Sequence, residues 1–416
     1  MQARLNLILS SLIILLPLAL LTGPFIPDLF ASVSALIFLF ILIKYNETKY
    51  LKNIYFYLGI LFIAYLIVST INSEFILFSL KSTSFYFRFL LLSLAVWYVL
   101  DNQKNFIKYF TISLIISFFL AIIAGIYQLY FGQNFIGIET PDARLLLIAS
   151  DQALLGNYLS RLFPLLVGLI ILNFNNKKMY FLIITIFISI DVITFLSGER
   201  TAIMLLLVSS LFILIFVKQF RLIRLLSFFV SISILIFITI FSTSIMERNI
   251  NQTINQLGLE KDSNQLNIFS PEHDRLYKVG LKIFTDYPIL GVGPNNFRNV
   301  CQKEKYAYFI DGNNVSCSTH PHHIYVQILS ETGLLGAIFL FTFIIYLFVI
   351  TGKQAYTMAR SQYSTLSDFQ ICLIAFFICT IFPFVPSLNL FNNWINIIYF
   401  TPVGFYLYSI YSLKNN

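Results

Sequence analysis

All four histidines of this 416-residue chain lie in one polar stretch, and three of them crowd into His320-Pro321-His322-His323. The ordinary pKa of imidazole lies near neutral pH, which makes histidine the commonest general acid or base. A long apolar run follows the cluster directly. The sequence therefore favours proton transfer beside a membrane surface, and solvated loop residues are the alternative interpretation.

The residues around the cluster predict how the histidines are held. We expect a helix to begin at residues 318–321, with a hydroxyl or imidazole cap and proline in the first turn. This start places His322 and His323 in the first turn, where free N–H groups attract phosphate and the helix dipole lowers the pKa of imidazole. At about 100° per residue, His323, Gln327 and Glu331 share one helix face. Zinc is the competing interpretation, but no Cys or carboxylate completes a familiar ligand spacing.

Charged side chains in or beside the apolar runs are the second candidate set, because charge in a membrane span is costly and by default functional. They are Arg88, Arg144, Arg161, Asp191 and Arg200, joined by Arg275 of the polar stretch. We expect them to form an outward-facing cationic rim. Guanidinium groups bind phosphate oxygens bidentately, so a diphosphate suits this rim. Alternatively, Arg88 or Arg161 pairs with Asp191 or reaches the lipid headgroups.

The composition predicts the elements that must position these residues. Hydrophobic residues make up 58% of the chain and charged residues 11%, with a mean hydropathy of +0.81. Apolar runs of about 16 to 27 residues can cross a hydrocarbon core of about 30 Å, and about twelve of them predict an all-α integral membrane protein. The runs are 5–22, 27–44, 53–71, 83–100, 106–131, 157–173, 179–197, 201–217, 224–243, 324–350, 368–384 and 393–412. The first lacks a small-x-small cleavage site, so we expect it to be retained as a span.

The basic residues predict the orientation. Lys and Arg cluster in the loops that become cytoplasmic when the N-terminus is cytoplasmic, and Arg224 is among them. This orientation places residues 244–323 outside as one large loop between the ninth and tenth spans, and it divides the chain into 1–243, 244–323 and 324–416. The net charge of +8 is then mostly a topology signal and gives no reason to expect a nucleic-acid partner.

The outer segment has recognisable parts. Residues 249–267 are rich in Asn and Gln, and we expect them to be mobile. A helix opens at Pro271 with acids in its first turn. Residues 291–297 read as a turn, because the third glycine of a dinucleotide fingerprint is missing. Cys301 and Cys317 share this segment, where an oxidising compartment would permit a disulfide.

Two motifs carry a family resemblance. Residues 320–327, His-Pro-His-His-Ile-Tyr-Val-Gln, and 331–336, Glu-Thr-Gly-Leu-Leu-Gly, resemble the signature of the O-antigen ligase and polymerase family. That signature is usually His-x-His-Asn-x-Tyr-Leu-Gln followed by Glu-x-Gly-x-x-Gly. Residues 286–293 and 197–201 are also similar to the family, as is the layout of twelve spans with one large loop. This chain has His323 where the family usually has Asn.

The resemblance implies an inner-membrane glycosyltransferase whose active site faces the periplasm. Such enzymes take a glycan from undecaprenyl diphosphate without a metal ion, nucleotide sugar or other cofactor. Ligases attach the glycan to lipid A–core, whereas polymerases attach it to another repeat unit, and the single large loop favours the ligase. A transporter for a lipid-linked glycan is the alternative from a different class. It would place charges or broken helices near the bilayer midplane.

The resemblance also implies roles for residues. The second histidine of the motif maps to His322, which would deprotonate the acceptor hydroxyl. The arginines that open the eighth span and precede the loop helix map to Arg200 and Arg275, which would bind the diphosphate together with Arg144 and Arg88. Supporting positions are His320, His323, Tyr325, Gln327, Glu331, Arg161 and Asp191.

Overall fold

Helices form nearly all of the regular structure. The computed structural model describes residues 1–141, 144–173, 179–256, 268–310, 313–361 and 364–413, and within these ranges the strands are β1 (Phe309–Ile310) and β2 (Asn313–Asn314). The helices that follow the apolar runs are α1 (Gln2–Ala19), α2 (Phe25–Tyr45), α3 (Ile54–Ile71), α4 (Ile76–Thr83), α5 (Phe87–Asn102), α6 (Phe106–Phe131), α7 (Leu155–Asn173), α8 (Tyr180–Leu196), α9 (Arg200–Phe216), α10 (Arg221–Phe241), α15 (Ile324–Ser361), α16 (Asp368–Thr380) and α17 (Asn393–Tyr411). The predicted all-α class is confirmed.

The predicted count of twelve spans is confirmed only in part. In the described part of the chain, eight helical segments are long and apolar enough to cross a membrane. Each of the twelve predicted runs contains a helix, but α8, α9 and α16 have only 17, 17 and 13 residues. The chain is a multi-pass membrane protein whose bundle mixes long helices with short ones.

The predicted run 368–384 is wrong at its end, because α16 stops at Thr380. Pro383 and Pro386 follow, and proline has no N–H with which to continue a helix. Backbone groups that follow α16 are no longer bonded within a helix, and one of them hydrogen-bonds to the histidine motif. The carbonyl of Ile381 accepts a hydrogen bond from the Tyr325 hydroxyl at 2.6 Å.

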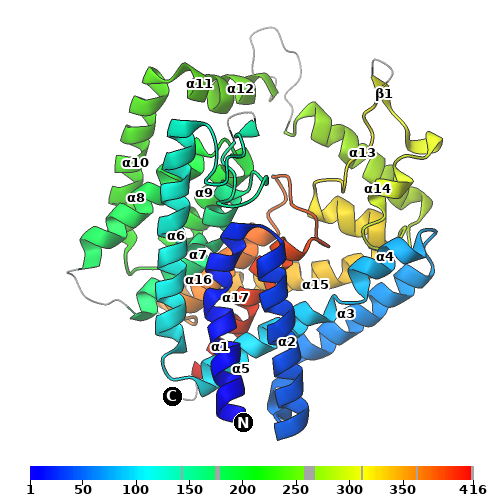
Figure 1. Cartoon of the computed structure of the whole chain (residues 1–416), viewed down its shortest axis with the longest axis horizontal. Helices are drawn as coiled ribbons and strands as arrows, with labels where there is room; N and C mark the ends of the chain where they lie inside the picture. Colours follow the sequence, from blue (N-terminus) through cyan, green and yellow to red (C-terminus); the bar gives the residue numbers. More distant parts are fainter. Residues whose placement is uncertain (142–143, 174–178, 257–267, 311–312, 362–363, 414–416) are drawn as a thin grey trace.

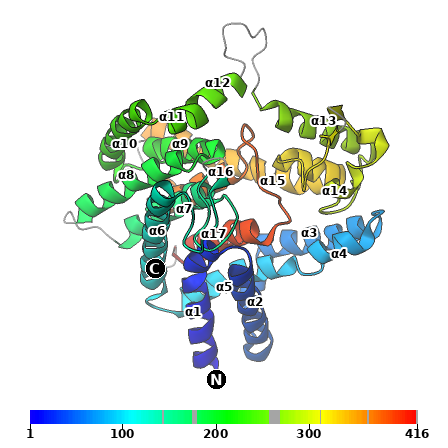
Figure 2. The same cartoon turned by 45° about the horizontal axis from the view of Figure 1, so that its top comes forward.

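The segment between α10 and α15 gathers at one end of the bundle (Figures 1 and 2). It contains α11 (Thr243–Met246), a π-helical turn (Glu247–Asn251), α12 (Gln252–Gln256), α13 (Pro271–Asp286) and α14 (Phe297–Val300). Residues 249–256 of the stretch predicted to be mobile are thus helical, and 257–267 lie outside the described residues. The helix predicted from Pro271 is confirmed as α13, with Ser270 as its N-cap. Its apolar face, which includes Leu276 and Ile283, packs against α15.

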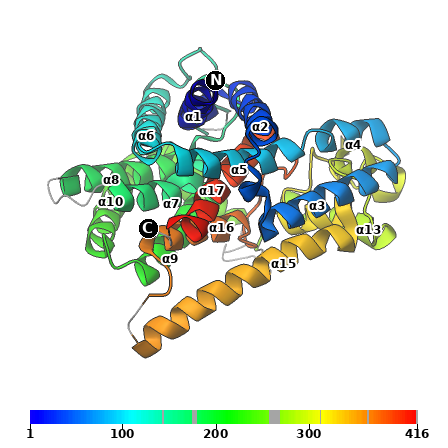
Figure 3. The same cartoon turned by 90° about the horizontal axis from the view of Figure 1, so that it is seen from below.

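A break in α15 receives the chain that follows α13. Gly333 has φ +62° inside the helix. The N–H groups of Val292 and Gly293 donate to the carbonyls of Ser330 and Glu331 at 3.0 and 2.9 Å, and Leu334 N–H donates to Pro288 at 2.8 Å. Backbone hydrogen bonds therefore hold the outer segment against α15 at this break. Beyond the break, α15 continues as a long helix beside α3 (Figure 3).

Replacing Gly333 by alanine is expected to destabilise the protein. A Cβ atom there would lie 2.3 Å from the carbonyl oxygen of Ile289, and the left-handed backbone alone costs about 1–2 kcal/mol for a residue with a side chain. Thermal unfolding in detergent should show a lower midpoint for Gly333→Ala. The matched variant Gly352→Ala lies in the same helix with open space at its Cβ and should unfold like the wild type. Equal midpoints for the two variants would contradict the close approach.

Candidate active site

One cavity of about 880 Å³ lies where the start of α9, α12, the start of α13 and residues 384–388 meet. Its charged and titratable lining consists of Arg144, Glu199, Arg200, Arg248, Glu272, His273 and His322. The remaining lining is largely apolar and includes Ile203, Met204 and Leu207 of α9 and Phe384. The cavity thus brings together His322 and Arg200, which are far apart in the sequence.

Of the three histidines in the 320–323 motif, only His322 lines the cavity. His320 is 4% exposed, its Nε2 donates to the carbonyl of Ser387 at 3.1 Å, and its Nδ1 lies 3.0 Å from the Thr319 hydroxyl. His323 donates from Nε2 to the carbonyl of Pro383 at 3.0 Å. His320 and His323 are therefore engaged by the chain itself, and His322 is the histidine that faces a ligand-sized space.

The predicted helix start is wrong, because His322 and His323 precede α15 instead of lying in its first turn. His322 has φ +55°, a left-handed conformation that no helix continues through. Its carbonyl accepts bonds from the Ser387 N–H at 2.8 Å and the Tyr277 hydroxyl at 3.4 Å. The first helical hydrogen bond of α15 runs from Gln327 N–H to the carbonyl of His323. His322 is thus held in a bend just outside the helix.

The environment keeps all these histidines uncharged at neutral pH. Burial, and then the neighbouring His273, lowers the pKa of His322 to about 4. Burial and His322 lower the pKa of His320 to about 3, and burial lowers the pKa of His323. The predicted direction is confirmed, but its first cause is burial and not a helix dipole. An imidazole without charge can accept a proton, as a general base must.

Three arginines line the cavity near His322. Arg144 and Arg200 were predicted, and Arg248 of the π-helical turn is the third. The positive charges of Arg144 and Arg248 both act on Arg200. No feature of the sequence singled out Arg248, because it stands in a segment whose charges balance. A cluster of guanidinium groups in one cavity suits a ligand with more than one negative charge.

The structure does not bring the other predicted cations to the cavity. Arg88 pairs with Asp28 at 2.8 Å. Arg161 is buried and donates to the Asn157 side chain at 3.2 Å and to the Tyr399 hydroxyl at 3.3 Å. Arg275 is absent from the cavity lining, since on α13 it stands two residues, about 200°, from His273.

Asp191 forms a buried ion pair with Arg224 at 2.7 Å, so it pairs with neither Arg88 nor Arg161. The Ser231 hydroxyl also donates to Asp191, and Arg224 donates to the Ser210 hydroxyl at 2.7 Å. Placing Arg224 in a cytoplasmic loop was wrong. It lies within α10, which starts at Arg221 and packs along α8 at the level of Asp191. The pair is satisfied inside the bundle and lies outside the cavity lining.

Gln327 and Glu331 hydrogen-bond the start of α15 to neighbouring segments, outside the cavity. The predicted shared face is confirmed, since Gln327 donates to Glu331 at 3.0 Å, and both side chains are fully buried. Glu331 also accepts the N–H of Phe297, which opens α14, at 3.0 Å. Gln327 donates to Asn389 at 2.7 Å. These two residues join α15 to the outer segment and do not face the cavity.

Glu199, which the sequence singled out only as part of a motif, orders the wall beside Arg200. Its carboxyl accepts the N–H of Gly156 at 2.6 Å and the side-chain amide of Asn157, so it caps the start of α7. Burial raises its pKa to about 7 despite these bonds and the nearby Arg144. The cap holds the start of α7 against the turn that precedes α9.

His273 is a second histidine in the cavity, and no motif in the sequence indicated a role for it. Its ring centre lies 5.6 Å from that of His322, and its Nδ1 is 2.6 Å from the Ser270 hydroxyl. Burial lowers its pKa, followed by the charges of Arg200 and Arg144. The charges of Arg200 and Arg144 thus act on His273, which in turn acts on His322.

The disulfide predicted between Cys301 and Cys317 is present, with their Cα atoms 5.3 Å apart. Cys372 and Cys379 are free and buried in α16. Within the described ranges, no group of three or more His, Cys, Asp or Glu side chains could hold a metal ion.

The fold and cavity define a multi-pass, all-helical membrane protein with a cationic cavity that contains two uncharged histidines. Residues 181–341 match the family profile described as O-antigen ligase, which confirms the resemblance carried by the sequence motifs. The match runs from α8 into α15 and includes Arg200, His273 and His322. No curated protein matches the chain. The family acts on lipid-linked glycans in O-antigen synthesis.

Proposed function

We propose that the protein is an inner-membrane O-antigen ligase that transfers glycan from undecaprenyl diphosphate to lipid A–core. One observation carries the proposal. A single cavity holds an uncharged His322 together with Arg144, Arg200 and Arg248, and all of these except Arg144 lie inside the match to the O-antigen ligase family. A base and an anion site are the two groups that this transfer requires.

The proposed reaction is a single displacement. His322 takes the proton of the acceptor hydroxyl, and the oxygen attacks the anomeric carbon of the donor glycan. The bond from that carbon to the diphosphate oxygen breaks, so the configuration at the anomeric carbon inverts. The arginines stabilise the negative charge that develops on the departing diphosphate, an effect that typically exceeds the contribution of the base. Arg275 remains a further candidate for diphosphate binding on the family resemblance.

The cavity is proposed to face the periplasm. The Cys301–Cys317 disulfide favours an oxidising compartment for the outer segment, and the periplasm provides one. A donor anchored in lipid suits this compartment, because it reaches the cavity without a soluble nucleotide pool. The apolar lining contributed by α9 offers a surface that tolerates part of a prenyl chain.

A reconstituted assay tests the function. Purified protein in detergent should join glycan from undecaprenyl diphosphate to lipid A–core, and addition of a chelator should leave the rate unchanged. Product that grows only on lipid-linked repeat units would identify a polymerase instead. Movement of the donor across vesicles without any glycan transfer would identify a transporter. Either result would overturn the ligase assignment.

A further inference from the structure

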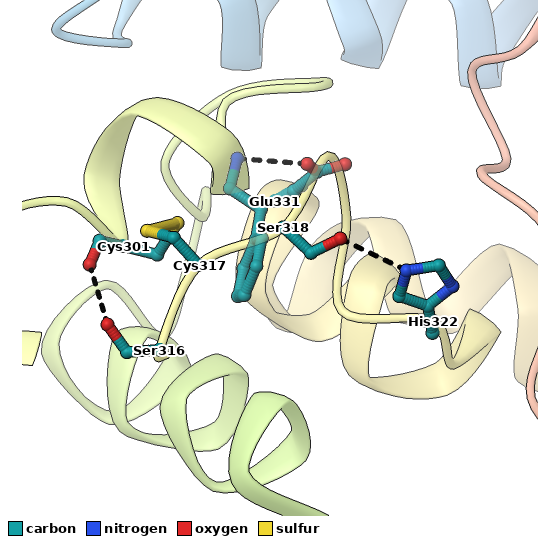
Figure 4. The surroundings of a disulfide bond; sticks show 7 residues. Cys301, Ser316, Cys317, Ser318, His322 and Glu331 are labelled. Atoms are coloured by element: carbon teal, nitrogen blue, oxygen red, sulfur yellow. Dashed lines mark hydrogen bonds between the residues drawn. A yellow bond between two sulfur atoms is a disulfide. The ribbon is translucent and has the colours of Figure 1, made fainter. Parts of the chain in front are cut away.

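Among the described residues, one side chain hydrogen-bonds to the His322 ring, and its hydroxyl can accept from or donate to a ring nitrogen. Ser318 Oγ lies 3.0 Å from His322 Nε2. Figure 4 marks this hydrogen bond. Among the described residues Nδ1 has no hydrogen-bond partner, so Nδ1 is the nitrogen left for an acceptor hydroxyl. A neutral imidazole carries one N–H, and a nitrogen that takes a proton must offer its lone pair. His322 can therefore act through Nδ1 only when Nε2–H donates to Ser318.

Ser318 is in turn held by the disulfide. It directly follows Cys317, which is bonded to Cys301 (Figure 4). Cys301 is fully buried at the end of α14, whose first N–H donates to Glu331 of α15. The disulfide thus ties Ser318 to an element that α15 already fixes. This matters because residues 318–323 belong to no helix or strand.

We propose that Ser318 is the positioning residue that orients the His322 ring, with its oxygen accepting Nε2–H when Nδ1 acts as the base, and that the Cys301–Cys317 disulfide keeps Ser318 in reach. The inference rests on the proposed role of His322 as the base. It gives the disulfide beside the His322 bend a role in the reaction. A bond that closes a loop over 16 residues restricts the positions its neighbours can take.

Ser318→Ala, Ser318→Thr and Ser316→Ala test the hydroxyl. Ser316 lies on the other side of Cys317, and its hydroxyl bonds to the carbonyl of Cys301 at 3.4 Å, away from His322 (Figure 4). Ser318→Ala should lower kcat by about 10–100-fold, the range seen when partners that orient a histidine are removed, with the donor KM unchanged. Ser318→Thr should restore most of kcat, and Ser316→Ala should behave like the wild type. A normal kcat in Ser318→Ala overturns the inference.

A double-mutant cycle tests the link to the disulfide. Replacing both Cys301 and Cys317 by alanine should lower kcat in the wild-type background and add little in the Ser318→Ala background, because both changes then act through one contact. If the cysteine replacements lowered kcat by the same factor in the Ser318→Ala background as in the wild type, the disulfide would not act through Ser318. The proposed function fails separately. If His322→Ala remained active, His322 would not be the base, and the proposed function itself would be contradicted. If His322→Ala were inactive and Ser318→Ala had a normal kcat, only the role of Ser318 would be contradicted.

Discussion

Replacing His322 by alanine is expected to reduce glycan transfer by about 10²–10⁴-fold, the usual contribution of a general base. His322 is the motif histidine that lines the cavity, whereas His320 and His323 each donate a hydrogen bond from a ring nitrogen to a backbone carbonyl. Initial rates at saturating donor, measured with purified protein, give the comparison. Size-exclusion profiles of the variant and wild type should match. Near-normal lipopolysaccharide from a strain that carries only His322→Ala would refute the assignment.

The same residue predicts an unusual pH profile. Because the pKa of His322 is lowered to about 4, its neutral form persists well below the ordinary histidine value of about 6.5. The rate should therefore hold as the pH falls through 6.5 and decline only towards pH 4. The lowered pKa also contributes stability that is fully present above about pH 6.5 and is lost as the pH falls through about 4. A rate that halves near pH 6.5, in protein that remains folded, would contradict the buried, neutral base.

Replacing Arg200 by alanine should reduce transfer by about 10²–10³-fold, the cost of removing one group that stabilises developing negative charge. Arg200 opens α9 at the cavity, where Arg144 and Arg248 supply further positive charge. Arg200→Lys should recover only part of the rate, because lysine cannot form the bidentate contact. Kinetics over a range of donor concentrations would separate a raised KM from a lowered kcat.

Lys278→Ala is the matched control for charge removal. Lys278 lies on the exposed face of α13, where it pairs with Asp274 and stays out of the cavity lining. It should transfer glycan at the wild-type rate. If Lys278→Ala and Arg200→Ala lost activity equally, general surface charge would explain the effect and the cavity would not.

The sequence predicted the helices well because lipid imposes a one-dimensional rule. A run of apolar residues long enough to cross the bilayer must be helical, and each predicted run contains a helix. The pairing of Cys301 with Cys317 and the helix at Pro271 followed from equally local signals. The approach of His322 to Arg200 came from the family resemblance, since no local pattern relates two such distant residues.

What the sequence could not predict depends on tertiary contacts. The bend at His322 is fixed by residues distant in the sequence, because the His322 carbonyl accepts bonds from the Ser387 N–H and the Tyr277 hydroxyl. The pairing of Asp191 with Arg224 depends on how far α10 is shifted along α8. Arg248 and His273 carry no periodic signal, and they are recognised as cavity residues only where the π-helical turn and α13 meet at the cavity.

The break at Gly333 has a consequence for the order of biosynthesis. Residues 288–293 leave the ribosome before α15, yet their backbone partners are Ser330, Glu331 and the amides just beyond Gly333. Until α15 has been made and inserted, this stretch lacks its docking site, and the bend that carries His322 also waits for Ser387, which follows α16. The arginine at the head of α9 is therefore in place before the catalytic half of the cavity exists. A nascent chain halted before the Gly333 break should expose residues 288–293 to protease, and the finished protein should protect them.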